Sequence, residues 1–343
     1  MDMASLGEFE LIARLTQQLP TRADVVLGAG DDCAMLDLGG RDLLLLTCDS
    51  QVEGVHFSLQ LSSPEQIGRK ALAINLSDIA AMGGEPRYAL VSLILPRQPS
   101  FTILDGIYAG LRQEAERYAT AIVGGNIAGA GKGEELIIDI TLVGTVERDH
   151  ALVRSGARVG DILCVTGTLG NSAAGLHTLL HVDQQYPEEA LAYVQERHRA
   201  PHARVHEGRV LGQLGPGIIT AMLDISDGLS GDLAHICERS GVGARIELAH
   251  LPLTPQLRII AERSGCDPLA WALHGGEEYQ LLFTVAPGHE HTVSEAVRTA
   301  TGTPVTKIGI ICPAEEGMQI VYPDGHQEGL PMQSWDHLRQ PDG

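Results

Sequence analysis

The sequence predicts an α/β fold divided into two domains, and three observations predict it. The chain has 343 residues, which is long for one compact domain and suits two domains of roughly 150–200 residues each. Hydrophobic residues make up 44% of the chain, which is enough for a large core. Segments with a helical repeat and segments with a strand-like pattern alternate along both halves. We place the boundary so that the domains cover residues 1–150 and 151–343.

In the first half, the clearest expected helix follows Ser63. Ser63 is a residue type that caps helix N-termini, Pro64 suits the first helical position, and two glycines at 83–84 suit the end. Apolar periodicity predicts the remaining elements. In chain order we expect a helix over 8–18, a buried strand over 43–46, the helix that starts at 64, a strand over 88–95, a helix over 100–118, a short strand over 121–123 and a long strand over 135–146.

The second half repeats the mixture of strands and helices. Strands are expected over 162–166, 218–225, 244–248, 279–285, 305–311 and 318–322. Helices are expected over 173–180, 188–199, 205–214 and 227–239. The interleaving predicts a second α/β or α+β domain.

Charge and composition weigh against several classes of partner. The chain has 44 acidic and 24 basic residues, so phosphate backbones would repel it, and nucleic acid is not an expected partner. The six cysteines form no C-x-x-C pair, so neither a disulfide framework nor a zinc site is expected. The first residues lack a signal-peptide pattern and no apolar run approaches 18 residues, so we expect a cytoplasmic protein without a membrane span.

Aspartates fall at the ends of the expected elements. Asp31 and Asp32 follow a glycine-rich turn, Asp49 comes just after a buried strand, and Asp224 and Asp227 bracket a strand–helix junction. In open α/β sheets, ligands bind at such strand ends. Each aspartate alone can equally be a helix cap or a turn former.

Asp78 is the sharpest case among these carboxylates. It continues the apolar stripe of Ile67, Ala71 and Ile74 on the helix that begins at Pro64. A carboxylate on a buried face must be paired, hydrogen-bonded or bound to a metal, and an ion pair remains an alternative. Together the aspartates suggest magnesium bound by oxygen ligands, as in sites that hold nucleotide phosphates.

Two glycine-rich segments are candidate phosphate-binding loops. The segment 129–133 lacks the Gly-Lys-Ser/Thr ending of a P-loop and leads into a strand, so we interpret it as a hairpin loop. The segment 166–170 lies between a strand and a helix. It offers backbone N–H groups to an anion, or it is a plain tight turn.

The motifs that carry these residues resemble the thiamine-monophosphate kinase family, in order and across nearly the whole chain. The resemblance implies the aminoimidazole-ribotide-synthetase-like fold, with the N-terminal sheets of a homodimer pairing into a barrel and ATP bound near that interface. The matching segments are 30–34, 49–57, 70–83, 166–170, 224–229, 275–279 and 335–337.

The resemblance also implies the reaction and its site. ATP would phosphorylate thiamine phosphate to thiamine diphosphate with several magnesium ions, and no residue would act as a catalytic base. The implied magnesium ligands are Asp32, Thr47, Cys48, Asp49, Asp78, Asn126, Asp224 and Asp227. The implied ATP contacts are Gly125, Asn126, Arg154 and Ser226, and the implied thiamine phosphate contacts are His56, Glu277 and Trp335.

Three positions depart from the family pattern. Asn126 stands where the family has an aspartate that ligates metal, so one ion is expected to bind more weakly. Cys48 stands where threonine is usual, which changes little if the backbone oxygen is the ligand. Glu278 replaces a common aspartate.

The sequence leaves two alternative functions. One is a different activity of the same superfamily, such as a cyclase, a selenophosphate-type synthetase or a hydrogenase-maturation protein. A selenophosphate-type synthetase would use an N-terminal reactive cysteine or selenocysteine, but no cysteine precedes Cys33. A hydrogenase-maturation relative would end in a reactive cysteine, which the last residues of this sequence lack. The other is a non-catalytic nucleotide-binding dimer that lost its activity with the change at Asn126.

Overall fold

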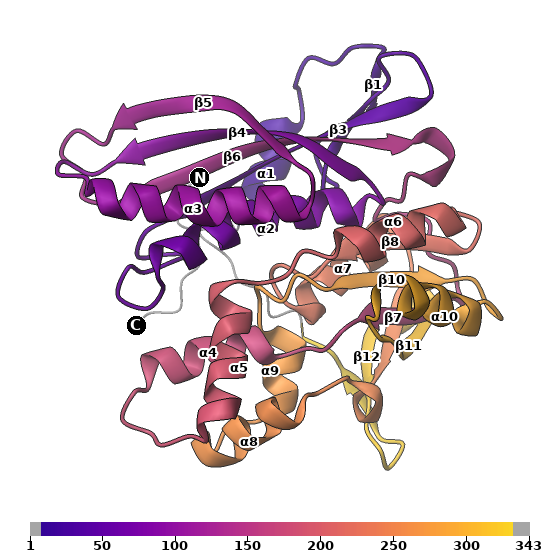
Figure 1. The fold of residues 1–343 in the computed structure, drawn as a ribbon. Helices are drawn as coiled ribbons and strands as arrows, with labels where there is room; N and C mark the ends of the chain where they lie inside the picture. Colours follow the sequence, from indigo (N-terminus) through magenta and orange to yellow (C-terminus); the bar gives the residue numbers. More distant parts are fainter. Residues whose placement is uncertain (1–7, 332–343) are drawn as a thin grey trace.

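The computed structural model describes residues 8–331 and contains two β-sheets flanked by helices (Figure 1). The first sheet has the strand order β1-β2-β3-β6-β4-β5, and the second has the order β13-β12-β9-β11-β7-β10-β8. The sheets come from separate halves of the chain, so the two-part α/β architecture expected from the sequence is confirmed. No described helix is long and apolar enough to cross a membrane.

The first half holds six strands and three α-helices in its described part. In order they are α1 (Glu8–Thr16), β1 (Val25–Leu27), β2 (Ala34–Leu36), β3 (Asp42–Val52), α2 (Pro64–Ala81), β4 (Glu85–Leu95), α3 (Phe101–Arg117), β5 (Ala121–Gly129) and β6 (Ile137–Glu147), followed by the 3-10 turn η2 (Arg148–His150).

The second half holds the second sheet and the remaining helices. In order they are β7 (Ile162–Thr166), α4 (Asn171–Leu180), α5 (Glu188–Arg199), α6 (Val205–Leu214), β8 (Ile219–Asp224), α7 (Leu229–Ser240), β9 (Gly243–Glu247), η3 (Leu248–His250), α8 (Pro255–Ser264), α9 (Pro268–His274), β10 (Leu281–Val285), α10 (Glu290–Thr301), β11 (Val305–Cys312), η4 (Ala314–Glu316), β12 (Met318–Val321) and β13 (Gln327–Gly329).

Helix α2 is the central element of the molecule. Its start is fixed by a capping box, in which the Ser63 side chain accepts from the Gln66 N–H and the Gln66 side chain accepts from the Ser63 N–H. The sequence predicted a single buried stripe on this helix, but α2 is buried on almost every side, because the first sheet, α3 and the second half all pack against it. One hydrophobic core joins both halves and includes Leu76 of α2, Leu211 of α6 and Phe283 of β10.

Two strands of the first sheet run well past their predicted C-terminal ends. Strand β3 runs to Val52, so Asp49 lies inside the strand and not after it, because β6 pairs with β3 along its whole length. Strand β5 runs to Gly129, which places Gly125 and Asn126 in an edge strand paired only with β4 in the described structure. Hydrogen bonding to a neighbouring strand extends both elements beyond their apolar residues.

The first sheet has one covered and one exposed face. Helices α2 and α3 lie against one face (Figure 1). The opposite face carries Cys48, Ser50, Leu90 and Asp139, of which the first three are exposed and the last is half-buried. We call this the open face.

Candidate metal and nucleotide site

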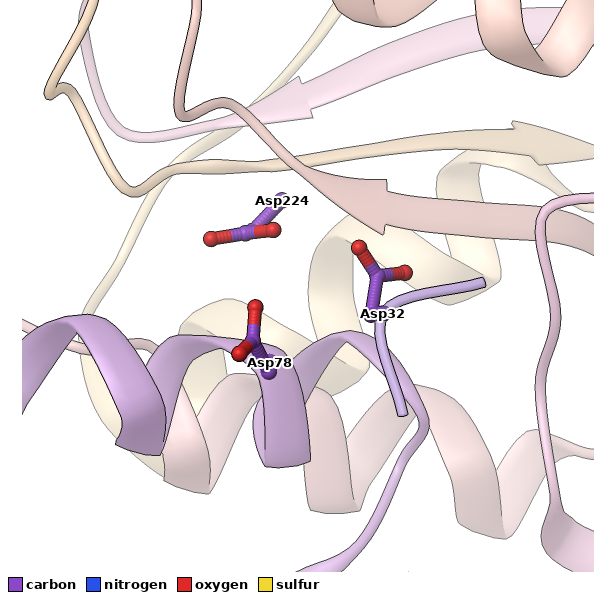
Figure 2. Close-up of side chains that lie close together, drawn as sticks. All are labelled: Asp32, Asp78 and Asp224. Carbon is purple, nitrogen blue, oxygen red and sulfur yellow. The ribbon is translucent and has the colours of Figure 1, made fainter. Parts of the chain in front are cut away.

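Three aspartates from distant parts of the chain meet at the junction of the two halves. Asp32 precedes β2, Asp78 lies on α2 and Asp224 ends β8. One carboxylate oxygen of each lies within 4.8 Å of those of the other two, and the side chains point toward one another (Figure 2). Two oxygens bound to one magnesium ion lie about 3–4 Å apart, so this spacing is close to what a shared ion needs.

The chain around each aspartate explains its position. Gly30 has a φ of +116°, a backbone conformation that side-chain-bearing residues rarely adopt, so the turn before Asp32 requires glycine. Ser77 Oγ donates a 2.5 Å hydrogen bond to Asp224 Oδ2. Because Ser77 directly precedes Asp78, α2 fixes both its own aspartate and the one at the end of β8.

Strand β3 adds two more oxygen-bearing side chains beside Asp78. Thr47 Oγ1 donates to Asp78 Oδ2 at 2.5 Å, and the Asp49 carboxyl group is hydrogen-bonded to Asp78. Cys48 lies between them in sequence and therefore faces the other way. Its thiol contacts Asp139 on the open face at 3.6 Å, so only its backbone oxygen is left to serve the three-aspartate cluster.

The cluster holds more carboxylates than the single nearby guanidinium, that of Arg154, can balance. Burial raises the pKa of Asp78 well above its usual range, and the charges of Asp49, Asp224 and Asp32 raise it further. Burial and the Asp32 charge raise the pKa of Asp224 to about 8 and that of Asp31 to about 7. Such groups are stabilised by protons or by cations.

An orphaned polar atom supports a cation at this position. Asp32 Oδ2 is buried and has no hydrogen-bond partner among the described residues. Asp32 Oδ1 accepts from Arg154 Nη2 at 2.5 Å, and the Arg154 backbone N–H donates to Asp31. The donor set consists of carboxylate and hydroxyl oxygens, which is the set that magnesium prefers.

The predicted ATP contacts are divided between two places. Arg154 lies at the cluster through Asp32, and Ser226 follows Asp224 by two residues. Gly125 and Asn126 lie instead on the exposed edge strand β5, and the structure does not bring them to the three aspartates. A Cβ at Gly125 would lie 1.8 Å from the Val91 oxygen, so the close strand contact explains the glycine.

Asp227 lies in the turn between β8 and α7. Its backbone N–H and that of Gly228 donate to Asp232 Oδ2, so this turn is held by a carboxylate from α7. Asp232 is buried, and its burial and the Asp227 charge raise its pKa. Asp232 was not predicted from the sequence, although an acidic residue in the first turn of a helix is a recognisable signal.

A second cluster of polar side chains surrounds Glu277. Lys70 Nζ lies 2.5 Å from Glu277 Oε1 and donates to the His56 backbone oxygen at 2.9 Å. His198 Nδ1 lies 3.3 Å from Glu277 Oε2, and burial lowers the pKa of His198 to about 4. The structure therefore brings His56 and Glu277 together through Lys70, while Trp335 lies outside the described residues.

Lys70 and His198 were missed as site residues by the sequence analysis. Lys70 is one of three lysines in the chain, and its 3% exposure marks it as a residue that needs a partner. Glu278 has a different role from Glu277. It accepts a 2.8 Å hydrogen bond from the Ser172 backbone N–H at the start of α4, and its burial raises its pKa to about 8.

Comparison with known proteins places this fold in one class. Residues 30–146 match the family model of the AIR synthase related protein N-terminal domain, and residues 158–320 match that of the C-terminal domain. The chain thus belongs to the AIR synthase related proteins. Solved structures of the hydrogenase maturation protein HypE share this fold, with TM-scores of 0.68–0.72 at 20–22% identity.

Within that class, the chain belongs to the thiamine-monophosphate kinase family. It is 41% identical to the thiamine-monophosphate kinase of Aquifex aeolicus over 83% of this chain and 87% of that protein. It is 37% identical to that of Escherichia coli K12, over 98% and 99% of the two chains. A solved complex of AaThiL with AMPPCP and TMP has a TM-score of 0.84 at 36% identity and covers 98% of this chain and 99% of that one. The family predicted from the sequence is confirmed.

Proposed function

We propose that this chain transfers the γ-phosphoryl group of ATP directly and in line to the phosphate of thiamine phosphate, giving thiamine diphosphate. The convergence of Asp32, Asp78 and Asp224 carries the proposal. Family membership supports the substrates, because the related AaThiL was solved with AMPPCP and TMP bound. The superfamily alternatives lack relatives of comparable identity among the matches described above.

The main barrier to the reaction is the approach of two anions. Two unit charges 4 Å apart repel by about 4 kcal/mol at an effective dielectric constant of about 20. Magnesium held by the aspartates, with Thr47 and Asp49 beside them, would offset this repulsion and stabilise charge on the transferring group.

No strong base is needed to start the transfer. The acceptor is a phosphate oxygen whose second pKa is about 6, so it is mostly ionised at neutral pH. This agrees with the described site, where the basic candidate His198 is tied to Glu277. What this chain's residues do is therefore to bind and orient the two phosphates.

The remaining site residues divide between the two substrates. Arg154, Ser226, Gly125 and Asn126 would contact ATP. His56, Glu277 and Trp335 would contact thiamine phosphate, and the Lys70 contact holds Glu277 in place. Asp227 and the Cys48 backbone oxygen complete the proposed metal ligands.

The chain is also proposed to work as a homodimer whose N-terminal sheets pair into a barrel. Tyr88 and Leu90 on β4 and Val123 on β5 are 53%, 44% and 58% exposed, which is unusual for large apolar residues on a sheet. A second copy that covers the open face would bury them. Light scattering should give twice the chain mass, and Leu90→Asp should lower it; a native monomer would refute the dimer.

The reaction itself is tested by following ADP formation. With ATP and magnesium, ADP should form only when thiamine phosphate is present, and thiamine diphosphate should form in equal amount. ATP binding without this turnover would instead indicate a non-catalytic nucleotide-binding protein. A phosphorylated enzyme trapped in a single turnover would contradict direct transfer.

A further inference from the structure

A small cavity of about 30 Å³ lies between the turn before α4, the last turn of α5 with the chain that joins it to α6, and the segment before β10. Its polar and charged lining includes Thr168, Arg197, His202, Arg204 and Glu278. None of the residues proposed above for magnesium, ATP or thiamine phosphate lines it. A cavity of this volume holds one or two water molecules or one small ion.

Arg197 and Arg204 bring two guanidinium groups to this cavity. Arg197 Cζ lies 5.0 Å from the centre of the Tyr193 ring, and no described carboxylate lies within 4 Å of the Arg197 nitrogens. Arg204 Nε donates to Gln280 Oε1 at 2.8 Å, and Arg204 Nη1 lies 3.5 Å from Glu207 Oε1. Arg204 Nη2 has no hydrogen-bond partner within the described part of the chain. One of the two positive charges is therefore left without an ion pair.

Glu278 lines the same cavity but does not pair with either arginine. Its Oε1 accepts the Ser172 backbone N–H at 2.8 Å, so this oxygen serves the start of α4. Neither guanidinium group forms an ion pair with it in the described structure. Burial raises the pKa of Glu278 to about 8, so at neutral pH the carboxyl group is mostly protonated and offers an O–H donor.

The electrostatic surroundings of the cavity are positive, although the chain carries a net charge of −20. Burial lowers the pKa of His202 to about 4, and the charges that lower it further all belong to arginines, namely Arg117, Arg197, Arg204 and Arg69. Glu114 pairs with Arg69 and Arg117, and Glu207 pairs with Arg204, so the Arg197 charge remains. A positive charge withdrawn from water without a partner is costly, and an anion in the cavity would reduce that cost.

The glycine-rich segment 166–170 contributes a side chain to this cavity and not a backbone cradle. The N–H groups of Gly167 and Leu169 donate to backbone oxygens elsewhere in the chain. Thr168 Oγ1 accepts from the Asn171 side chain at 3.0 Å, which leaves the Thr168 hydroxyl hydrogen for a ligand. The segment is therefore a tight turn that presents one hydroxyl donor to the cavity.

We propose that this cavity binds one small monovalent anion, of which chloride is the simplest, between the guanidinium groups of Arg197 and Arg204, with the Thr168 hydroxyl as a further donor. One unpaired positive charge is balanced by one negative charge. The volume excludes nucleotides and thiamine phosphate, because pockets for molecules of that size measure about 300–1,000 Å³. The site is separate from the aspartate cluster, so the inference does not depend on the proposed function.

Melting temperatures of the full chain measure this binding. Chloride is titrated in the presence of EDTA, and sodium gluconate, whose anion is too large for the cavity, keeps the ionic strength constant. The native protein should show a saturable increase in melting temperature, because a ligand that binds only the folded state stabilises it. Arg197→Gln should need about tenfold or more chloride for the same increase, while Arg197→Lys, which keeps the charge, should retain most of the response.

Arg258→Gln removes an exposed arginine on α8 and is the matched control, so it should respond to chloride like the native chain. A crystal soaked in sodium bromide then locates the ion, with an anomalous peak expected beside Arg197, Arg204 and Thr168. The inference is overturned if no peak lies there, or if Arg197→Gln and the native chain respond equally to chloride. A peak without a saturable response also overturns it, because the ion would then bind at crystal concentration only.

Discussion

Asp78 is the residue on which the metal cluster most depends. It lies between Thr47 and Asp49 of β3 and the Asp224 carboxylate, and its burial among these charges raises its pKa well above the usual range. Asp78→Asn keeps the shape of the side chain and removes its charge, so the fold should persist while the magnesium concentration needed for half-maximal rate rises about tenfold or more. Asp78→Ala should abolish turnover.

A magnesium titration of the rate measures this effect, with circular dichroism as the check on folding. Asp105→Asn on the exposed side of α3 serves as the control for loss of one negative charge. A native magnesium dependence in Asp78→Asn would show that Asp78 has a structural role only.

Lys70 is expected to stabilise the fold by neutralising Glu277. Replacing it with methionine leaves a partly buried carboxylate beside a neutral His198. Lys70→Met should lower the free energy of unfolding by about 2–3 kcal/mol, less than for a fully buried pair because the Glu277 side chain is 26% exposed. Urea unfolding measures the change.

The double variant provides the control for this pair. Lys70→Met combined with Glu277→Gln should recover part of the lost stability, because no unpaired charge remains. A change within about 0.5 kcal/mol in Lys70→Met alone would mean that the contact contributes little.

At the scale of the elements, locally encoded features were predicted well. Helix α2 begins where Ser63 and Pro64 indicated, and α5, α6 and β7 match their expected ranges. The ends of β3 and β5 depend on hydrogen bonds to β6 and β4, which no local pattern specifies. Because β3 was expected to end at residue 46, the alternation of side chains along residues 47–49 was not predicted. That alternation places the Cys48 side chain on the opposite face of the sheet from Thr47 and Asp49.

Other elements were missed despite visible signals. Helix α8 has a Thr254 cap followed by Pro255, and α9 has an Asp267 cap followed by Pro268. Helix α9 has only seven residues, and the apolar residues of α8 are interrupted by two arginines and a glutamate, so neither helix gave a clear repeat. Strands β1, β2 and β13 have three residues each, too few for a repeat to be read.

The contact between α2 and α3 gives a prediction for these elements. A Cβ at Gly110 of α3 would lie 1.9 Å from the Glu65 backbone oxygen, so the helices approach at glycine. Gly110→Ala should lower the free energy of unfolding by about 1–3 kcal/mol, although alanine favours helix more than glycine does.

Gly217→Ala is the matched control, because nothing lies within 4 Å of its added Cβ. Urea unfolding of both variants compares a Cβ that meets the neighbouring helix with one in a turn that meets nothing. Equal or higher stability of Gly110→Ala would contradict this close contact.

At the scale of the whole molecule, the site exists because two halves share one core. Asp32, Asp78 and Asp224 each carried a local signal, but their convergence depends on α2 packing against both sheets, which no spacing in the sequence reveals. The resemblance supplied the set of residues, and the structure separates Asn126 and the Cys48 thiol from the cluster. Lys70 and His198 were found only through their contacts.

The crowded carboxylates also predict how the stability of the whole protein depends on pH. Folding raises the pKa of Asp224 to about 8, from about 3.9 in an unfolded chain. Between these values the folded state holds a proton that the unfolded state has lost, so the metal-free protein should lose stability as pH rises from about 4 to about 8.

Melting temperatures in EDTA and in magnesium test this dependence. In EDTA the melting temperature should fall between pH 6 and pH 8, and the increase caused by magnesium should be larger at pH 8. A larger magnesium effect at pH 6 would contradict the assignment of these carboxylates as metal ligands.

The central claim is that aspartates from three distant segments share metal ions. The most direct measurement is an anomalous difference map from crystals grown with Mn²⁺, an unreactive ATP analogue and thiamine phosphate. We predict a strong peak bounded by the carboxylates of Asp32, Asp78 and Asp224. A map with both substrates bound and no peak at these carboxylates would contradict the account.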